Sequence, residues 1–559
     1  MSSIESIELN VRSYRSALKS SLEITVNSLT NSHLKMESIL HPYGNNPDIV
    51  DISTLVYTLL RLPSTLDKTK LVVMGQSPEV FENGGYPNVT SWPKCPPTAR
   101  RRVRYFNPSI HILAEIISSI SDVDDVVNSI VAYQTEWNKL HHLLKLHYPH
   151  LRDLKKAIHS KNIINTLKIT PKDWQNLCQS LGKNYSLRFT RIYNLHHNLR
   201  IRLLAGSWID YTKTTQLWWQ NIEPHLASQK SPTKADRPVY FISSNTHSLL
   251  NLVTGQAVSH QKELLKLAQN HHPDLDNLWQ NIQTSESFLH QNDFLYYLSK
   301  YMVDNQKYQQ DWQKLQNKLD ILSIPPTHFL NSTLQIFPVA SLSKSKFLDS
   351  RLKITNAPKL QRATALIINI DYPLGFAAYH VLSEVLENIN DIRGVYILGK
   401  AAVLNSEIGD IQIPRLTFDE HTQNSYIYKN CFNSFFPFPN NQGSILTNQK
   451  SVSVLGTFLE NQALIDKYSE NNLTVIEMET GPYLNAITES CYDLQTPRGT
   501  IVDLNSAPFD LGVINYSSDT PYSQAKNLGA GSLNLSGLEP VYLGSLAILQ
   551  RIINLEESK

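Results

Sequence analysis

The sequence predicts two structural parts: a mainly α-helical N-terminal region, and an α/β C-terminal domain built as three layers around a mostly parallel mixed sheet. A chain of 559 residues is too long for one hydrophobic core. Its 41% apolar and 18% charged residues are typical of a folded chain. More than half of the 20 glycines lie after residue 370, which indicates the tight turns of an α/β domain there.

The bulk composition argues against several classes of protein. A net charge of +2 gives no global field that would draw the chain to nucleic acid or to an anionic membrane. The four cysteines lie far apart, in none of the spacings of a metal site. The sequence shows neither a signal peptide nor a run of about 18 apolar residues. We therefore expect a cytoplasmic protein without a metal ion and without a membrane partner.

Helical periodicity dominates residues 1–230, the first expected domain. Apolar residues recur at helical spacing from Ile4 to Leu29 and again through 55–62. Residues 70–75 (KLVVMG) are expected to form a short buried strand. Further helices are expected at 108–146, 154–167, 171–181 and 184–204.

An arginine-rich run, TARRRVRYF (98–106), places four arginines beside two aromatic residues. Such a run can hold phosphates or stack on bases. More often it is a solvated face or a contact to a partner. We expect no nucleic-acid partner, although RNA or DNA binding through Arg100, Arg101, Arg102 and Arg104 stays open as an alternative.

Residues 231–327 are expected to form a strand and a helix, followed by helices that lead to a linker. PVYFIS (238–243) is a strand-type run, and SSNTHS (243–248) starts a helix whose free N–H groups could hold an anion. A plain capped helix start is the commoner outcome. Pro325 and Pro326 fit neither a helix nor a ladder, so 323–327 is the expected boundary.

The third expected domain, 328–559, alternates strand-length apolar runs with amphipathic helices. The expected strands are 334–337, 365–370, 394–398, 411–414, 452–456, 473–478 and 511–516. The expected helices are 375–388, 461–469, 482–490 and 539–555. Strands joined by helices form a largely parallel sheet with both faces covered. Ligands of such sheets gather at the carboxyl ends of the strands.

Four segments at these strand ends carry a resemblance. They are GVYILGKAAVLNSEIGDIQIP (394–414), VLGTFLENQALIDKY (454–468), IEMETGPYLNAI (476–487) and INYSSDTPY (514–522). In this order they resemble the nucleoside phosphorylase and nucleosidase superfamily, of the purine-nucleoside phosphorylase and methylthioadenosine nucleosidase type. The matching features are a small-residue turn with a Gly-Asp-x-x-x-Pro return, a Gly-Thr strand, a Glu-Met-Glu strand and a Ser-Asp turn. The resemblance covers roughly 330–559 and implies a phosphorylase-like domain there.

The resemblance implies roles for three residues around the sugar and the leaving base. Glu479 would accept hydrogen bonds from the ribose 2′- and 3′-hydroxyls, and Met478 would pack on the sugar. Asp519 would protonate the departing purine near N7. The alternative interpretations are that Glu479 lies at a solvated strand end and that Met478 is a core residue. Glu477 is expected to be structural.

The resemblance implies four further residues that would contact the substrate. The chain also differs from the superfamily at the positions that bind phosphate. Phe458 would stack on the base, although a core phenylalanine is as frequent. Ser518, Gly399 and Lys400 belong to the Ser-Asp and small-residue turns. Phosphorylases of the superfamily hold phosphate with an arginine where this chain has Ile397, and their Gly-Asp-Pro-x-Arg loop is missing from FPVASLSKSK (337–346). This loss favours hydrolysis over phosphorolysis, or binding without turnover.

His421 is the remaining catalytic candidate. It lies in the cluster Asp419-Glu420-His421, where an imidazole can activate water. A polar surface loop is the alternative interpretation. Asp371 and His380 are weaker candidates.

The sequence thus predicts a hydrolase or glycosyltransferase that cleaves the N-glycosidic bond of a purine nucleoside or nucleotide. The alternative is a non-catalytic module that senses a nucleotide or nucleoside, with a helical N-terminal half that binds a partner. We expect no cofactor, and inorganic phosphate is a candidate co-substrate that Lys400 could hold as a point charge. A solvated turn lysine is an equal alternative for Lys400. The resemblance also implies a homo-oligomer.

Overall fold

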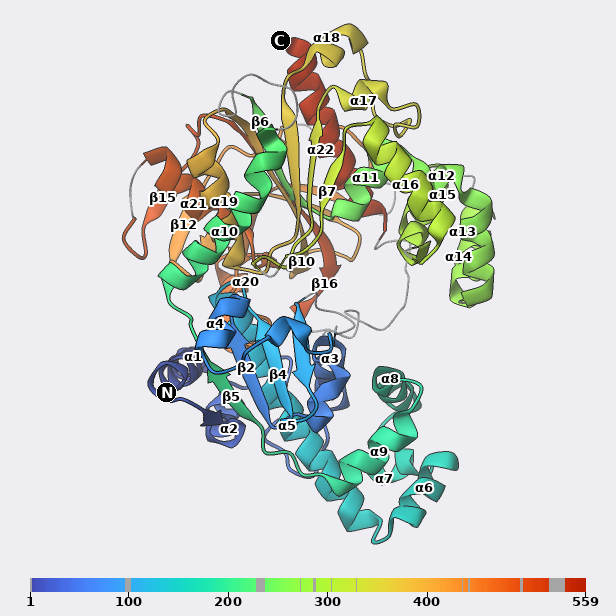
Figure 1. Cartoon of the computed structure of the whole chain (residues 1–559), viewed down its shortest axis with the longest axis vertical. Coiled ribbons are helices and arrows are strands. Elements are labelled where there is room, and N and C mark those ends of the chain that lie inside the picture. The colour runs from blue at the N-terminus through green and yellow to red at the C-terminus, as the bar shows by residue number, and fades with distance from the viewer. Residues whose placement is uncertain are drawn as a thin grey trace.

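Two β-sheets organise the chain, a smaller one in the N-terminal part and a larger one in the C-terminal part. Figure 1 shows the first sheet, mostly blue, in the lower half of the view and the second sheet, mostly yellow to red, in the upper half. The computed structural model describes residues 3–95, 102–227, 237–271, 273–284, 288–302, 304–327, 329–434, 436–440, 443–492, 496–521 and 538–559. Within these ranges no helix is long and apolar enough to cross a membrane.

The smaller sheet has the strand order β1-β5-β2-β4-β3. Its fully buried centre, β2 (Leu71–Gly75), is parallel to β4 (Ile112–Ile116) and β5 (Arg200–Leu203). β1 (Ile24–Thr25) and β3 (Arg104–Asn107) are antiparallel edges. The helices of this part are α1 (Ser3–Ser20), α2 (Val26–Lys35), α3 (Ile52–Arg61), α4 (Pro78–Asn83), α5 (Ile120–His147), α6 (Leu151–His159), α7 (Ile163–Leu167), α8 (Pro171–Leu181) and α9 (Tyr185–Asn194).

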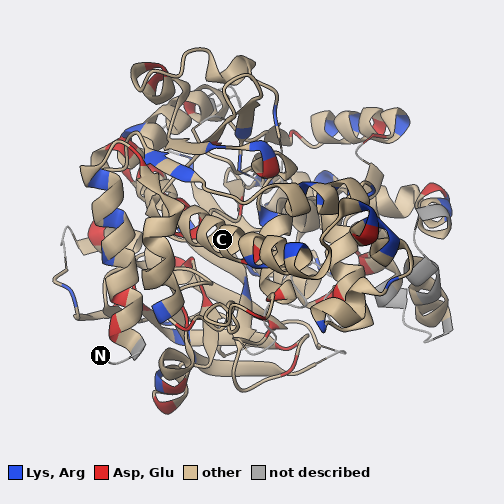
Figure 2. Cartoon of the chain, turned by 90° about the horizontal axis from the view of Figure 1, so that it is seen from below, with Lys and Arg blue, Asp and Glu red and all other residues tan. Residues whose placement is uncertain are grey.

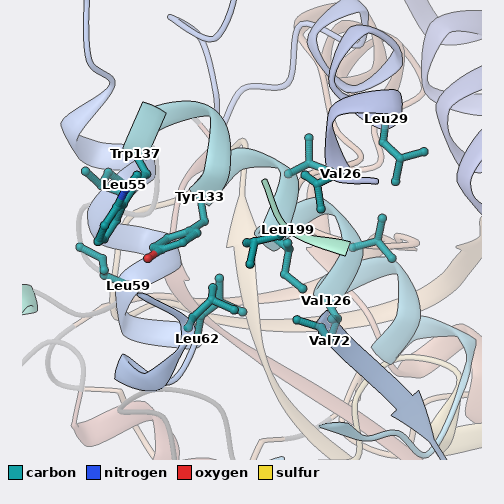
Figure 3. Close-up of a cluster of buried hydrophobic side chains, with 14 of the residues drawn as sticks. Val26, Leu29, Leu55, Leu59, Leu62, Val72, Val126, Tyr133, Trp137 and Leu199 are labelled. Atoms are coloured by element: carbon teal, nitrogen blue, oxygen red, sulfur yellow. The ribbon is translucent and has the colours of Figure 1, made fainter. Parts of the chain in front are cut away.

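Helix α5 is the centre of the N-terminal core, because α2, α3 and the sheet cover it on several sides. Figure 3 shows Val126, Tyr133 and Trp137 of α5 among apolar side chains from these neighbours. The neighbours labelled there are Val26, Leu29, Leu55, Leu59, Leu62, Val72 and Leu199. Because α5 is buried on most of its surface, it buries polar residues as well, and Asp122 and Asp124 are paired there with arginines.

Strands replace parts of two expected helices. The helix expected at 108–146 begins only at Ile120, because β4 precedes it, and the one expected at 184–204 stops at Asn194, before β5. RIRL alternates polar and apolar residues, and ILAEI is a short, largely apolar run, and both patterns also fit a strand. Hydrogen bonding to β2 makes both segments strands and not helices. The N-terminal region is therefore mainly helical but contains a sheet.

The larger sheet has eleven strands in the described part of the chain. They are β6 (Val239–Ser244), β7 (Leu322–Ile324), β8 (Leu334–Pro338), β9 (Leu366–Asp371), β10 (Ile392–Val403), β11 (Ile411–Asp419), β12 (Asn424–Ile427), β13 (Ile445–Ser453), β14 (Val475–Glu477), β15 (Ile501–Asp503) and β16 (Asp510–Asp519). The run β16-β10-β6-β9 is parallel. Because β16 pairs with both β10 and β11, the strands β10, β16, β11, β13 and β14 close into a ring.

Helices cover both faces of this sheet. Val239 and Phe241 of β6 pack with α10 (Trp208–Ala227), α19 (Ala377–Asn388) and α21 (Thr480–Tyr492), whereas Tyr240 and Ile242 pack with α11 (Thr246–Thr254), α15 (Phe288–Ser299) and α22 (Glu539–Ser558). Alternate residues of a strand point to opposite faces, so the domain has three layers. The remaining helices are α12 (Gln256–Ser259), α13 (Gln261–His271), α14 (Pro273–Thr284), α16 (Gln306–Lys318), α17 (Ser341–Lys344), α18 (Ala357–Arg362) and α20 (Gln462–Glu470).

The boundary expected at 323–327 falls inside the larger sheet. β7 and β8 form an antiparallel hairpin, and Pro325 and Pro326 lie in its loop, where no ladder hydrogen bond is needed. β6 lies between β10 and β9, so the sheet already begins at Val239. The expected division into 231–327 and 328–559 therefore separates strands that pair with each other. Asn245 caps α11 through the N–H groups of His247 and Ser248, so this helix start is the plain capped one.

The arginine run contributes to the fold. Arg102 and Arg104 are buried: Arg102 pairs with Asp122 (2.9 Å) and Asp125, and Arg104 pairs with Glu115 (2.5 Å). These two guanidinium groups are therefore engaged by carboxylates and are not displayed to a nucleic acid. Arg100 and Arg101 lie outside the described residues. Figure 2 shows basic and acidic residues interspersed over the described chain, as the small net charge predicts.

The two parts share one hydrophobic core. Val452, Leu464 and Ile465 of the C-terminal part belong to the same buried cluster as the apolar residues of α1 to α5. Polar contacts cross the same junction: Asn461 Nδ2 donates to the Met36 carbonyl (3.1 Å), and the Ile39 N–H donates to the Glu460 carbonyl (3.0 Å). The two parts are expected to unfold together, because neither keeps a complete core without the other.

Replacing Ile465 by alanine tests this shared core. Ile465 is fully buried, so Ile465→Ala should lower the free energy of unfolding by about 2–5 kcal/mol and leave a single transition. Urea titration followed by both fluorescence and circular dichroism measures it. Ile501→Ala, at a residue 71% exposed, is the matched control and should change stability by less than about 0.5 kcal/mol. Two separate transitions in the wild type would contradict the shared core.

Candidate functional site

Segments that are distant in the sequence meet at Gly375, in the turn between β9 and α19. A Cβ atom on Gly375 would lie only 2.5 Å from Ser121 Oγ and 3.7 Å from Met478 Cε. Its φ of +51° lies in the left-handed region, which glycine enters without strain. Glycine is therefore needed twice here, once for the backbone conformation and once for the close approach of α5 and the β14–α21 turn.

Glu479 is held at the start of α21. The Gly375 N–H donates to Glu479 Oε1 at 3.3 Å, and the side chain is half-buried. Its neighbour Glu477 is buried and accepts hydrogen bonds from the Ser453 hydroxyl and from the N–H groups of Glu479 and Thr480, both at 2.7 Å. Burial raises the pKa of Glu477. Glu477 thus caps the helix and fixes the backbone that carries Glu479, which is the structural role expected for it.

His421 stands between a carboxylate and a hydroxyl. Its Nδ1 lies 2.9 Å from Asp419 Oδ1, and its Nε2 lies 3.4 Å from Ser121 Oγ. A carboxylate only accepts hydrogen bonds, so a neutral His421 carries its proton on Nδ1 and presents the lone pair of Nε2. Asp419 is fully buried, and the His421 side chain is 5% exposed. This is the arrangement of an imidazole general base with a carboxylate behind it.

Ser121 is a residue of the candidate site that the sequence did not predict. Its hydroxyl oxygen accepts the Phe376 N–H at 2.9 Å, so its own proton can be donated toward His421 Nε2. The side chain is buried at the start of α5, in the N-terminal part. Ser121 and His421 are 300 residues apart in the sequence, and no local pattern marks their contact.

Asp519 and Ser518 end β16 on one side of β10. Asp519 is 6% exposed and accepts the Thr520 N–H at 2.9 Å, whereas the Ser518 hydroxyl donates to the Ala401 carbonyl at 3.3 Å. Ala402 of β10 pairs with Asp519 on one side and with Ile476 on the other. Asp519 and β14 are therefore separated by two strand spacings, about 10 Å. The ring closure brings Asp519 and the Glu477–Glu479 segment to the same end of β10.

The remaining predicted residues differ in their surroundings. Lys400 is exposed on β10, and Gly399 lies against Asn515, whose Oδ1 would be 3.2 Å from an added Cβ. Phe458 is 2% exposed and packs on Tyr57 and His33 of the N-terminal part, with ring centroids 5.4 and 5.8 Å away. It is a core residue here, the alternative that the sequence left open. The aromatic ring beside His421 belongs to Phe376, 5.0 Å away.

A cavity of about 780 Å³ adjoins this cluster, and His421, Phe376 and His380 contribute to its wall. Burial lowers the pKa of His380 to about 4, so this imidazole is neutral at physiological pH. Glu420, also in the wall, accepts the Tyr468 hydroxyl at 2.5 Å, and burial raises its pKa. Within the described ranges no three His, Cys, Asp or Glu side chains are grouped so that they could hold a metal ion.

The chain matches the sequence model of one family, and its similarity to solved structures is low. The sequence model of a family of unknown function (DUF6909) matches residues 26–554. No curated protein matches. Among solved structures, an S-adenosylhomocysteine nucleosidase from Streptococcus pyogenes matches at 12% identity over 57% of this chain and 97% of its own, with a TM-score of 0.30. A uridine phosphorylase from Schistosoma mansoni matches at 9% identity over 58% and 88%, also with a TM-score of 0.30. At such scores the function has to be argued from the side chains of this chain.

Glu460 gives the region a pH-dependent stability. It is 8% exposed, and burial together with the nearby Glu420 raises its pKa from 4.5 to about 8. Between these pH values the folded state keeps a proton that the unfolded state has lost, so this residue's contribution to stability falls as pH rises. Glu460→Gln removes the effect and should be more stable than the wild type at about pH 9, by a few kcal/mol, but not below about pH 4.5.

Urea unfolding of Glu460→Gln across that pH range measures the effect. Glu470→Gln, at an exposed position of α20, is the control and should follow the wild type at every pH. A stability difference between Glu460→Gln and the wild type that does not grow with pH would show that Glu460 does not hold its proton in the folded state.

Proposed function

The chain belongs to this family of unknown function, DUF6909, and we propose that it hydrolyses the N-glycosidic bond of a purine nucleoside or nucleotide. The observation that carries the proposal is the convergence at Gly375 of a ribose-type carboxylate, Glu479, with the His421–Asp419 pair. One group suits the sugar and the other suits the activation of water, and both lie at the end of a sheet where ligands bind.

Glu479 supplies the sugar contacts. Its carboxylate sits at the N-terminus of α21, where the helix dipole favours negative charge. Two vicinal hydroxyls can donate to its two oxygens, and each such charge-assisted bond is stronger than a neutral one. Met478, which approaches Gly375, offers an apolar surface for the sugar ring. Negative charge near the ribose also stabilises the oxocarbenium-like transition state.

His421 activates the attacking water. The contact from Nε2 to Ser121 Oγ is long, at 3.4 Å, and a water molecule between substrate and imidazole can replace it. The water oxygen attacks the anomeric carbon, and its proton passes to Nε2 while Asp419 stabilises the imidazolium. Hydrolysis is preferred over phosphorolysis because the position expected to hold a phosphate arginine is the buried aliphatic Ile397.

Asp519 acts on the leaving base. As the carbon–nitrogen bond breaks, its electron pair stays on the purine, and a proton from Asp519 at N7 neutralises the departing base. The proton that His421 took from water then restores the acid, so protons balance over the cycle. Asp519 and β14 lie on opposite sides of β10, two strand spacings apart, and this span is comparable to the length of a nucleoside. In the proposal, Ser518, Gly399 and the exposed Lys400 lie beside the bound nucleoside. We also propose that the chain forms a homo-oligomer.

Incubating the purified protein with candidate substrates, and measuring the free base that they release, tests the proposal. A panel of purine nucleosides and nucleotides, analysed by chromatography, should yield free base without phosphate. Glu479→Gln should lower kcat/KM by about 10- to 100-fold, because it weakens charge-assisted hydrogen bonds to the sugar. His421→Asn and Asp519→Asn should each lower kcat by ~10²–10⁴-fold, because they remove acid–base groups.

Two results would decide against this account. If no substrate yields free base while nucleosides still bind, the chain is a sensing module. If base appears only with inorganic phosphate, water is not the nucleophile. Glu470→Gln, which changes an exposed carboxylate far from Gly375 in the sequence, is the matched control and should keep wild-type rates.

A further inference from the structure

The cavity beside His421 has a charged wall that comes from α1. Glu8, Arg12, Arg15 and Lys19 line it, at the spacing of one helical face. Arg15 is held by the buried Asp124, with its Nε 3.0 Å from Asp124 Oδ1, so this guanidinium is fixed in position. The other members of the stripe are exposed, and exposed ion pairs such as Arg12–Glu8 are weak enough to exchange for a ligand.

Positive charge exceeds negative charge around this cavity. Arg498 joins the three cations of α1 in the wall, whereas the carboxylates in the wall are Glu8 and Glu420. Asp124, behind the wall, offsets the charge of Arg15, and one net positive charge remains even when Glu420 is counted as ionised. Burial raises the pKa of Glu420, which weakens its negative contribution. An anion is therefore favoured in the part of the cavity next to α1.

Another part of the wall is aromatic. Trp208 is 51% exposed, and its ring centroid lies 5.4 Å from that of Phe376 and 5.0 Å from that of His380. The His380 ring packs against Trp208 and is only 4% exposed, so it supports the tryptophan from inside the protein. A planar ligand would cover the exposed side chain of Trp208.

We propose that this cavity binds a nucleotide, with the base against Trp208 and the phosphate at Arg12, Arg15 and Lys19. The cavity is distinct from the proposed ribose site, because Glu479 is not part of its wall. The two sites share His421, which lines the cavity and faces Ser121. A nucleotide bound here would therefore touch the imidazole assigned to water activation. The binding itself does not depend on the proposed reaction.

Calorimetric titration of the full chain with AMP, adenosine and inorganic phosphate tests this site. AMP should bind more tightly than adenosine, and its affinity should fall as salt rises. Lys19→Glu should lower the affinity for AMP by about tenfold and leave the affinity for adenosine unchanged. Trp208→Ala should lower the affinities for both AMP and adenosine by about tenfold or more. Lys35→Glu and Ile209→Ala, at exposed positions outside the wall, are the matched controls and should bind as the wild type does.

The same titration on Glu479→Gln separates this site from the ribose site. AMP binding that persists in Glu479→Gln and still falls with Lys19→Glu supports the cavity. Binding that is lost in Glu479→Gln and unaffected by Lys19→Glu would assign the nucleotide to the ribose site and overturn the inference. AMP that binds no better than adenosine, or not at all at millimolar concentration, would also overturn it.

Discussion

The close contact at Gly375 is the constraint on which the site depends. The start of α5, the β9–α19 turn and the β14–α21 turn approach one another there so closely that one methyl group would collide with Ser121 Oγ. The contact joins the N-terminal and C-terminal parts, which also share a hydrophobic core. Because of it, the Gly375 N–H reaches Glu479 and the Ser121 hydroxyl reaches His421. The N-terminal part thus builds one side of the candidate site.

The buried carboxylates divide the work between structure and chemistry. Glu477 uses its oxygens on Ser453 and on the first N–H groups of α21, so it is committed to the fold. Asp419 is committed to His421 and Thr422. Glu479, one residue beyond Met478, is half-buried and reaches the turn that precedes α19. Desolvating three carboxylates in one region is costly unless each is hydrogen-bonded, and these contacts meet that condition.

The sequence predicted seven of the C-terminal strands, because strand-length apolar runs bounded by turn residues are local signals, but it missed β7, β12 and β15. It also predicted a structural Glu477, whereas the sugar-binding role of Glu479 stays a proposal. It did not predict that β6 lies in the middle of the larger sheet, because pairing with β9 and β10 is set by distant segments. It could not predict Ser121, whose contact with His421 spans 300 residues. The stripe of Glu8, Arg12, Arg15 and Lys19 is visible in the helical spacing of α1, but what faces it is a matter of tertiary structure.

The central claim is that water, activated at His421, cleaves a purine N-glycosidic bond over Glu479. The most direct measurement is a turnover in water enriched in oxygen-18, without phosphate, followed by mass spectrometry of the sugar product. The account predicts free purine base and one atom of oxygen-18 on the anomeric carbon of the sugar. Recovery of intact nucleoside or nucleotide across the whole purine panel would contradict the account.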